Sequence, residues 1–296
     1  MEPKLSCLST SCQAIALIQF GIFDGPSSLS LANCSYSISA FVSDWDKKQY
    51  KTAFDQVLAY IEAGDIYQAN LTFSLFADFE GDPWTFYKDL QLKQKVKHGA
   101  FVDLDSEISI LSRSPELFFK TDSEMNISTR PMKGTQPRDL DAEKDQQNLN
   151  FLKNDIKNRA ENLMIVDLLR NDISRISKVG TVKVPELYRV ETYETVHQMT
   201  SLIIGEMNKT TTIVELFAAL FPCGSITGAP KIRAMEIIHE LEQRPRDIYC
   251  GTIGWMAPDG SSEFNVAIRT LLMQNGKAVL NVGGGCLLYT SPSPRD

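Results

Sequence analysis

Two short segments of the chain combine a lysine with small and turn-forming residues. The first reads Arg-Pro-Met-Lys-Gly-Thr at positions 130–135, and the second reads Pro-Cys-Gly-Ser-Ile-Thr-Gly-Ala-Pro-Lys at positions 222–231. Glycine lets a backbone turn tightly, and the free N–H groups that begin a following helix attract an anion. Both segments are candidates for a site that closes around a small anion, although a simple loop-to-helix cap explains Thr227–Lys231 equally well.

Lys133 is the candidate nucleophile of the first segment, which we expect to form a turn. Neighbouring cations lower the pKa of a lysine and free its lone pair for attack on carbon. Arg130 is close in sequence, and Lys231 is a second cation that we consider for the same neighbourhood. The alternative is an ordinary solvated loop lysine.

Glu161 falls on the apolar stripe of a predicted helix, together with Met164, Ile165 and Leu168. A carboxylate on such a stripe is costly unless a cation or hydrogen bonds compensate it. One partner is Lys157, one helical turn earlier. The other is a hard divalent metal ion, for which Mg²⁺ is the natural candidate.

Glu116, in Ser-Pro-Glu, begins a predicted strand. If it points into a cleft, burial raises its pKa and makes it a proton donor. A solvated glutamate at the edge of a strand is the alternative.

Arg269 interrupts a predicted apolar strand, and an inward arginine there requires a carboxylate. The run Gly283-Gly284-Gly285 is expected to end the next strand and to offer bare N–H groups, which form a carboxylate-binding nest. A flexible end of the chain is the alternative for the glycines.

Hydrophobic periodicity and turn residues predict the elements that position these side chains. We expect helices over 44–63, 83–95, 140–172, 212–220 and 231–242. We expect strands over 14–20, 36–41, 67–77, 99–102, 107–112, 117–121, 125–129, 178–184, 196–206, 248–257, 264–274 and 277–282. Strands and helices follow one another in mixed order, with several hairpins, and this predicts an α+β fold with largely antiparallel sheets.

The composition excludes several classes of function. The 296 residues carry 30 basic and 37 acidic side chains, so the net charge of 30 − 37 = −7 argues against nucleic-acid and anionic-membrane partners. No apolar run reaches the roughly 18 residues of a membrane span, and we identify no signal peptide. The six cysteines lack a Cys-x-x-Cys spacing. We therefore expect a cytoplasmic protein with reduced thiols and without a membrane partner.

Taken in order, these segments resemble the chorismate-binding catalytic domain of anthranilate synthase component I, aminodeoxychorismate synthase component I, and the isochorismate and salicylate synthases. The resemblance covers roughly residues 14–285. It implies two large antiparallel sheets stacked orthogonally, with outer helices and an active site between the sheets. It also implies chorismate as the substrate and Mg²⁺ as the cofactor.

The resemblance also assigns roles to residues. Glu161 would bind the Mg²⁺ that grips the ring carboxylate, and Glu116 would protonate the departing C4 hydroxyl. The remaining roles would be divided as follows: the enolpyruvyl carboxylate held by Arg269, Tyr249, Gly283, Gly284 and Gly285; the ring lined by Gly134 and Thr135; the reacting side chain flanked by His197 and Thr227; and positive potential added by Lys231.

Two residues distinguish the subfamilies. Gln68 stands where the water-using isochorismate and salicylate synthases have a lysine, so the resemblance implies ammonia as the nucleophile. Lys133 stands where anthranilate synthases usually have alanine, and it implies an aminodeoxychorismate synthase component I that forms a covalent lysine intermediate. Ammonia would come from a partner glutamine amidotransferase, and the product would serve folate synthesis. Anthranilate synthase component I and a non-catalytic chorismate- or amidotransferase-binding remnant are the alternatives.

The two ends of the chain depart from the family. We interpret residues 1–45 as a remnant of an N-terminal region and 46–285 as the catalytic domain. Residues 286–296 resemble a translated sequencing-library adapter, which we interpret as a non-native tail. In the family, the segment after the glycines supplies a second Mg²⁺ carboxylate. One expectation is therefore that the chain as written is inactive or folds poorly.

Overall fold

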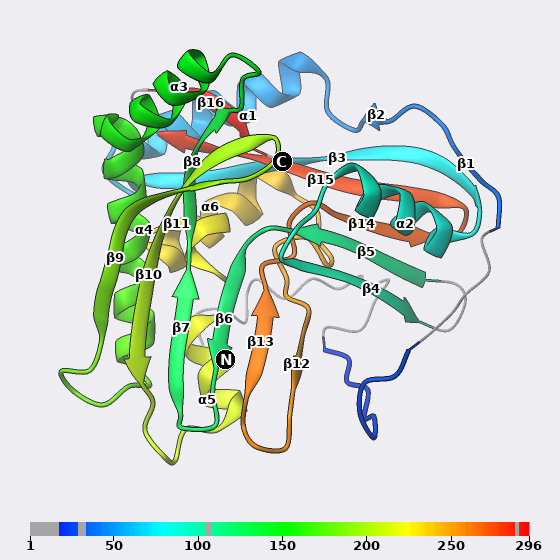
Figure 1. Cartoon of the computed structure of the whole chain (residues 1–296). Helices are drawn as coiled ribbons and strands as arrows, with labels where there is room; N and C mark the ends of the chain where they lie inside the picture. Colours follow the sequence, from blue (N-terminus) through cyan, green and yellow to red (C-terminus); the bar gives the residue numbers. More distant parts are fainter. Residues whose placement is uncertain (1–17, 29–33, 105–107, 288–289, 296) are drawn as a thin grey trace.

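The computed structural model describes residues 18–28, 34–104, 108–287 and 290–295, and their strands form two antiparallel sheets. In Figure 1 the strands of the smaller sheet run across those of the larger sheet. The α+β fold with two large antiparallel sheets is thereby confirmed. Most of the strand predicted over 14–20 lies outside the described residues.

The larger sheet has the strand order β1-β3-β15-β14-β5-β4, and β2 and β11 also pair with β3, while β16 pairs with β15. Its strands are β1 (Tyr36–Ile38), β2 (Val42–Ser43), β3 (Gln68–Gly81), β4 (His98–Leu104), β5 (Ile108–Ser114), β11 (Gly228–Ala229), β14 (Thr270–Gln274), β15 (Lys277–Leu287) and β16 (Thr290–Arg295). A two-residue turn, Asn275-Gly276, joins β14 to β15, and both turn residues have positive φ, as a tight hairpin requires.

The smaller sheet has the strand order β12-β13-β6-β7-β10-β8, with β9 paired to β10. Its strands are β6 (Leu117–Thr121), β7 (Asn126–Arg130), β8 (Met132–Pro137), β9 (Lys183–Thr192), β10 (Val196–Glu206), β12 (Gly254–Met256) and β13 (Ser262–Asn265).

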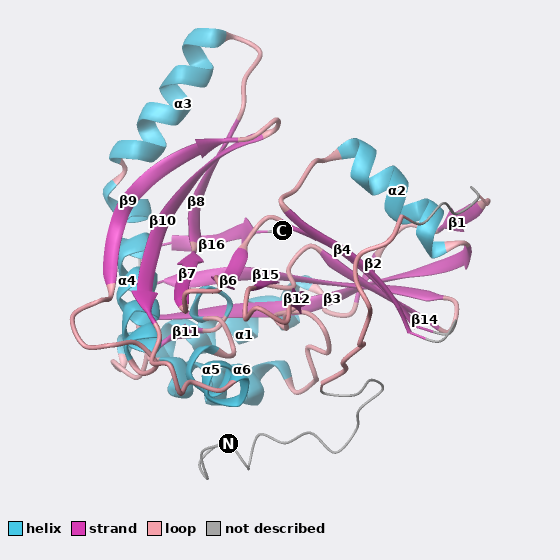
Figure 2. Cartoon of the chain, turned by 60° about the horizontal axis from the view of Figure 1, so that its bottom comes forward, coloured by secondary structure: helices cyan, strands magenta, loops and turns pink. Residues whose placement is uncertain are grey.

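Six α-helices cover the sheets within the described residues, and their starts are capped by side chains at most positions. They are α1 (Lys47–Glu62), α2 (Pro83–Lys93), α3 (Ala142–Asn154), α4 (Ile156–Ser174), α5 (Ile213–Leu220) and α6 (Lys231–Glu242). Capping boxes at Asp46 and Thr212 satisfy the first N–H groups of α1 and α5. In Figure 2 helix α3 projects beside the far ends of β9 and β10.

Three apolar clusters hold these layers together. The largest lies between the smaller sheet and helices α4 and α5, and includes Phe119, Ile127, Leu169 and Ile203. A second packs α1 and α6 on the first half of β3, and a third packs α2 near the other end of that strand. The alternate side chains of β3, namely Gln68, Asn70, Thr72 and Ser74, are buried but polar. One face of this strand therefore serves the core, and the other carries a row of polar groups.

The helix predicted over 140–172 is wrong as a single element. Asp155 has an extended backbone (φ −65°, ψ 119°), ends α3, and begins α4 by accepting the N–H of Asn158 at 2.8 Å. Aspartate is a favourable N-cap, so a new helix can begin at Asp155. The apolar periodicity continues across this boundary and therefore did not reveal it.

Three other predictions require correction. Lys133 lies in strand β8 rather than in a turn. The strand predicted over 264–274 is two strands in different sheets, because the chain turns a corner at Arg269, where φ is 49°. In the segment predicted as a strand over 248–257, only Gly254–Met256 forms one.

The glycine run does not end its strand. Gly283, Gly284 and Gly285 lie within β15, which continues to Leu287 and pairs there with β3 on one side and with β16 on the other. The glycine N–H groups are thus part of a sheet and do not form a separate nest. The division of the chain at residue 285 stays a prediction.

Candidate functional site

Lys133 is the central feature of the site, because its side chain is ionisable and yet only 2% exposed. The pairing of β8 with β10 jumps from Thr135↔Gln198 to Met132↔Thr200, so two residues of β8 face one residue of β10. Lys133 and Gly134 form this bulge, and Gly134 has a φ of 90° that favours glycine. A bulge re-aims a side chain relative to the regular pleat.

The amine of Lys133 is directed at the second sequence segment. Its Nζ donates to the backbone oxygen of Ser225 at 2.9 Å. Ser225 lies in a short 3₁₀ helix, Gly224–Ile226, and Thr227 Oγ1 closes this loop by donating to the backbone oxygen of Cys223 at 3.1 Å. The two segments singled out in the sequence therefore meet in space.

Glu116 belongs to the same neighbourhood. It is 3% exposed and follows β5, where its backbone oxygen accepts the N–H of Val266 at 3.1 Å. Burial, followed by the charge of Glu116, raises the pKa of the Cys223 thiol to about 12. The charge of Glu116 therefore acts on Cys223, which directly precedes the 3₁₀ helix that contains Ser225.

Both cations that were considered as neighbours of Lys133 are paired with carboxylates. Lys231 Nζ lies 2.6 Å from Asp172 Oδ2, and Arg130 Nη1 lies 3.0 Å from Glu186 Oε2 and 3.1 Å from Glu191 Oε1. Their positive charges are largely neutralised locally. Burial, opposed by Lys231, raises the pKa of Asp172. Asp172 was not among the predicted site residues, although it lies three helical turns after Glu161 on the same side of α4.

The glycines of β15 make room for polar side chains. A Cβ atom at Gly283 would lie 2.8 Å from Asn70 Nδ2 and 3.0 Å from the hydroxyl of Tyr249, and one at Gly285 would lie 2.8 Å from Gln68 Nε2. Gln68, Asn70 and Tyr249 thus converge on the bare backbone of β15. We therefore attribute the glycine run to this close approach.

Gln68 carries an unsatisfied acceptor. Its side chain is 1% exposed, and no described residue donates a hydrogen bond to Oε1. An unpaired buried amide oxygen costs roughly 1–3 kcal/mol, and such groups in native proteins require a specific explanation. A ligand that donates a hydrogen bond would provide one.

His197 is held by the protein on both ring nitrogens. It is 1% exposed on β10, its Nε2 lies 2.9 Å from Asp145 Oδ1 of α3, and its Nδ1 lies 2.9 Å from Thr192 Oγ1 of β9. Asp145 was not among the predicted site residues, because it lies near the start of the helix predicted over 140–172 without any distinctive pattern.

The remaining predicted site residues are more widely distributed. Glu161 is 7% exposed on α4, and Thr135 is exposed on β8 next to Gly134. Arg269 is partly buried at the corner between β13 and β14, and its backbone oxygen accepts the N–H of Arg113 at 2.9 Å.

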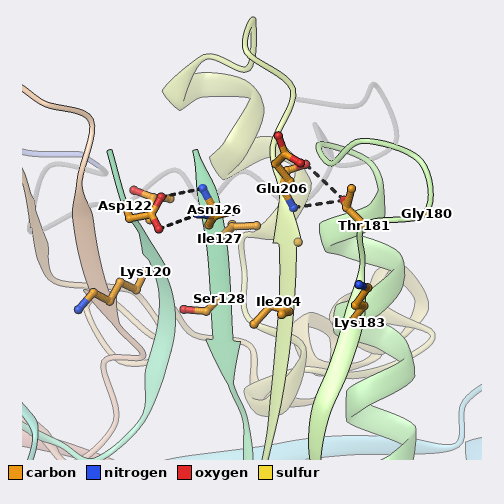
Figure 3. Close-up of a pocket in the computed structure, with 12 residues that line it drawn as sticks. Lys120, Asp122, Asn126, Ile127, Ser128, Gly180, Thr181, Lys183, Ile204 and Glu206 are labelled. Carbon is orange, nitrogen blue, oxygen red and sulfur yellow. Dashed lines mark hydrogen bonds between the residues drawn. The ribbon is translucent and has the colours of Figure 1, made fainter. Parts of the chain in front are cut away.

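A groove of about 460 Å³ lies elsewhere, at the far end of the smaller sheet. Figure 3 shows Lys120, Ser128, Ile204 and Lys183 across its floor on four neighbouring strands. None of the predicted site residues lines this groove, so it is distinct from the Lys133 site.

Comparisons with known proteins identify the family of the chain. Residues 13–293 match the family model of chorismate binding enzymes. The chain belongs to the chorismate-binding enzyme family. Aminodeoxychorismate synthase component 1 of Escherichia coli is 44% identical over 247 residues, which cover 82% of this chain and 54% of that protein. Anthranilate synthase component 1 of Saccharolobus solfataricus is 35% identical over 257 residues, covering 87% and 61%.

Solved structures of the chorismate-binding family share the fold. Anthranilate synthase component I from Streptococcus pneumoniae superposes with a TM-score of 0.77 at 30% identity, covering 89% of this chain and 57% of that one. The chain thus spans about half the length of the curated relatives it matches. Among the described residues, no helix has the length and apolar character needed to span a bilayer.

Proposed function

We propose that this chain catalyses the amination of chorismate to 4-amino-4-deoxychorismate, a precursor for folate synthesis. The relatives named aminodeoxychorismate synthase component 1 support this proposal at 42–44% identity. The observation that carries it is the buried amine of Lys133, 2.9 Å from the Ser225 carbonyl, within a bulge in the pairing of β8 with β10.

The proposed chemistry has two steps. The neutral amine of Lys133 attacks C2 of the ring, the double bonds shift, and the C4 hydroxyl leaves as water after taking a proton from Glu116. Ammonia then adds at C4, the double bonds shift back, the lysine amine leaves C2, and the new C4 ammonium group returns a proton to Glu116. Burial disfavours the charged form of an amine, which helps to supply the nucleophile.

Gln68 suits the second step. Its unsatisfied Oε1 accepts a hydrogen bond from an incoming N–H donor, and an amide cannot remove a proton from water. We propose that Gln68 orients the incoming ammonia, which a partner glutamine amidotransferase would supply. Tyr249 and Arg269 would bind the enolpyruvyl carboxylate, and Thr227 and His197 would border the reacting groups.

Mg²⁺ is implied by the family, and Glu161 is the residue that would hold it. No group of three or more His, Cys, Asp and Glu side chains suited to a metal occurs among the described residues. Since Mg²⁺ in enzymes is often bound by one or two carboxylates with substrate and water, Glu161 fits a site that the substrate completes. The bound ion would neutralise the ring carboxylate.

The test is to incubate the chain with chorismate, Mg²⁺ and ammonium and to identify the product by mass spectrometry. Aminodeoxychorismate, absent with Lys133→Ala, is the expected result. Anthranilate, which fluoresces and lacks the enolpyruvyl group, would instead assign anthranilate synthase activity. Chorismate binding without any product would assign a non-catalytic binding role.

A further inference from the structure

A buried ion pair lies behind the site, on the edge of strand β3. Arg246 donates from Nε to Glu242 Oε2 at 2.9 Å and from Nη2 to Glu242 Oε1 at 2.7 Å, and the two side chains are 14% and 1% exposed. Such a two-pronged pair is geometrically specific. Neither residue belongs to the chemistry proposed above.

The pair fills a gap in the larger sheet. On this edge of β3, β11 pairs with Gln68 and Ala69, and β2 pairs with Leu75 and Phe76. Between them, Glu242 Oε1 accepts the backbone N–H of Thr72 at 2.8 Å, and Arg246 Nη2 donates to the backbone oxygen of Asn70 at 2.6 Å. The ion pair therefore replaces a neighbouring strand and keeps the polar row of β3 in place.

The same guanidinium reaches the loop that holds Lys133. Arg246 Nη1 donates to the backbone oxygen of Ile226 at 3.0 Å, and Ile226 directly follows Ser225, the acceptor of the Lys133 amine. Asn70 also donates its backbone N–H to Thr227 at 2.8 Å. One side chain thus joins β3 to the loop.

The backbone of Arg246 extends these connections to a third part of the site. Its carbonyl oxygen accepts the N–H of Tyr249 at 2.9 Å and the side-chain amide of Asn281 at 3.3 Å. The Tyr249 hydroxyl lies over Gly283. Although burial lowers the pKa of Arg246, the charge of Glu242 raises it above its ordinary value, so the guanidinium stays charged.

We propose that Arg246, held in place by Glu242, is a positioning residue that aligns Lys133, Gln68 and Tyr249 for the reaction. Its side chain acts through the Ile226 and Asn70 carbonyls, its backbone oxygen acts through the Tyr249 N–H, and it touches neither substrate nor reacting atoms. The inference rests on the proposed function for the reaction it serves, but the geometry it concerns can be measured separately.

The test is the double variant Arg246→Met with Glu242→Gln, which removes both charges together, because a buried charge left alone destabilises a fold. Glutamine keeps an acceptor for Thr72. We expect a folded protein whose chorismate KM changes less than about threefold, while kcat and the rate of the Lys133 adduct fall about 100-fold, as displaced catalytic groups can produce. Arg246→Lys should not retain the parent kcat, because one ammonium cannot reach Glu242, Ile226 and Asn70 together.

Arg244→Met is the matched control. Arg244 is also partly buried beside β3 and contacts Ser74 and Asn281, but among the described residues it makes no hydrogen bond to the 224–227 loop. We expect its kcat to stay within about threefold of the parent chain. An unchanged kcat in the folded double variant, or an equal loss in Arg244→Met, would overturn the proposal. Should the double variant not fold, Arg246→Lys takes its place with the same expected division between kcat and KM.

A readout without chorismate separates this inference from the proposed function. Lys133 is acetylated with acetic anhydride, and the rate is followed by peptide mass spectrometry. If Arg246 positions the loop, the folded double variant should label Lys133 at least about threefold faster, because the Ser225 carbonyl no longer holds the amine. An unchanged rate would contradict the positioning role. If labelling of Lys133 is faster in the double variant as expected, but the parent chain forms no aminodeoxychorismate, only the proposed reaction would be contradicted.

Discussion

His197 Nε2 lies 2.9 Å from Asp145 Oδ1, and this contact joins the smaller sheet to helix α3. Arg138 Nε binds the same oxygen at 2.8 Å, and this guanidinium holds the pKa of the Asp145 carboxyl well below its ordinary value. A carboxylate at this position accepts a hydrogen bond from Nε2, and the Thr192 hydroxyl, which can donate or accept, pairs with Nδ1. The ring is therefore oriented by three elements of the fold.

A histidine held on both nitrogens is better suited to orientation than to proton transfer. We predict that His197→Gln, which retains hydrogen-bonding ability, lowers kcat/KM for chorismate by less than about tenfold. Loss of a general acid or base typically costs about 10²–10⁴-fold. Steady-state kinetics would measure the effect, and a loss of 1,000-fold with a normal unfolding temperature would show that His197 transfers a proton.

Gly134, the glycine of the bulge, is predicted to tolerate replacement by alanine poorly. Alanine there would adopt a φ of 90° and place a Cβ 2.8 Å from Asn158 Oδ1 and 2.9 Å from Leu152 Cδ1. The backbone conformation costs about 1–2 kcal/mol, and crowding in a packed region adds about 1–3 kcal/mol. Urea unfolding of Gly134→Ala should show the sum of both penalties.

Gly260→Ala is the control that separates these penalties. Gly260 has nearly the same φ, 89°, but no atom lies within 4 Å of its added Cβ. It should show only the backbone penalty of about 1–2 kcal/mol. Equal destabilisation in the two variants would mean that the neighbours of Gly134 move away without cost.

Much of this architecture could be predicted from the sequence, because periodicity is strong where one face is buried. The strands β6 and β10 and the helix α6 begin and end where the pattern predicts. The break at Asp155 escaped prediction because apolar spacing continues on both sides of it. The corner at Arg269 escaped because strand-forming residues flank it in both sheets, and only the tertiary fold reveals the change of sheet.

In the candidate site, too, some residues could be predicted from the sequence and others could not. Lys133 and the 222–231 segment stood out because cations beside glycines are locally unusual. The partners Asp172, Asp145 and Glu242 are ordinary helix carboxylates, and their roles follow from contacts 59, 52 and 170 residues away along the chain. Local composition contains no signal for such distant pairs.

Gln68 provides a test of how the nucleophile is held. We predict that Gln68→Met, which keeps the volume but removes the acceptor, raises the KM for ammonia at least about tenfold, the equivalent of one hydrogen bond of about 1.4 kcal/mol. The chorismate KM should stay within about threefold. Initial rates over an ammonium titration at fixed pH would measure both constants.

Thr72→Val is the matched control for Gln68. Thr72 lies on the same face of β3, is fully buried, and has a hydroxyl without a hydrogen-bond partner among the described residues. Its replacement should leave the ammonia KM unchanged. A rise in the chorismate KM of Gln68→Met with an unchanged ammonia KM would place Gln68 against the substrate instead.

The ion pairs of Arg130 predict a pH dependence of stability. The Arg130 guanidinium, with Arg189 beside it, lowers the pKa of Glu186 to about 2 from an ordinary 4.5. A carboxyl with a depressed pKa in the folded state stabilises the fold above the unfolded pKa, and this contribution is lost as the pH falls through the folded pKa. The stabilisation should therefore be complete above about pH 5 and vanish toward pH 2.

Arg130→Gln tests this expectation. Because Glu186 is partly exposed, we predict a loss of about 1 kcal/mol or less in the free energy of unfolding at pH 7. The difference from the parent chain should shrink steadily between pH 4.5 and pH 2. Arg170→Gln, which removes an exposed pair with Asp167, serves as the control for a general charge effect. Urea unfolding across this range would decide, and a difference that stays constant with pH would show that Arg130 stabilises the fold by packing rather than by charge.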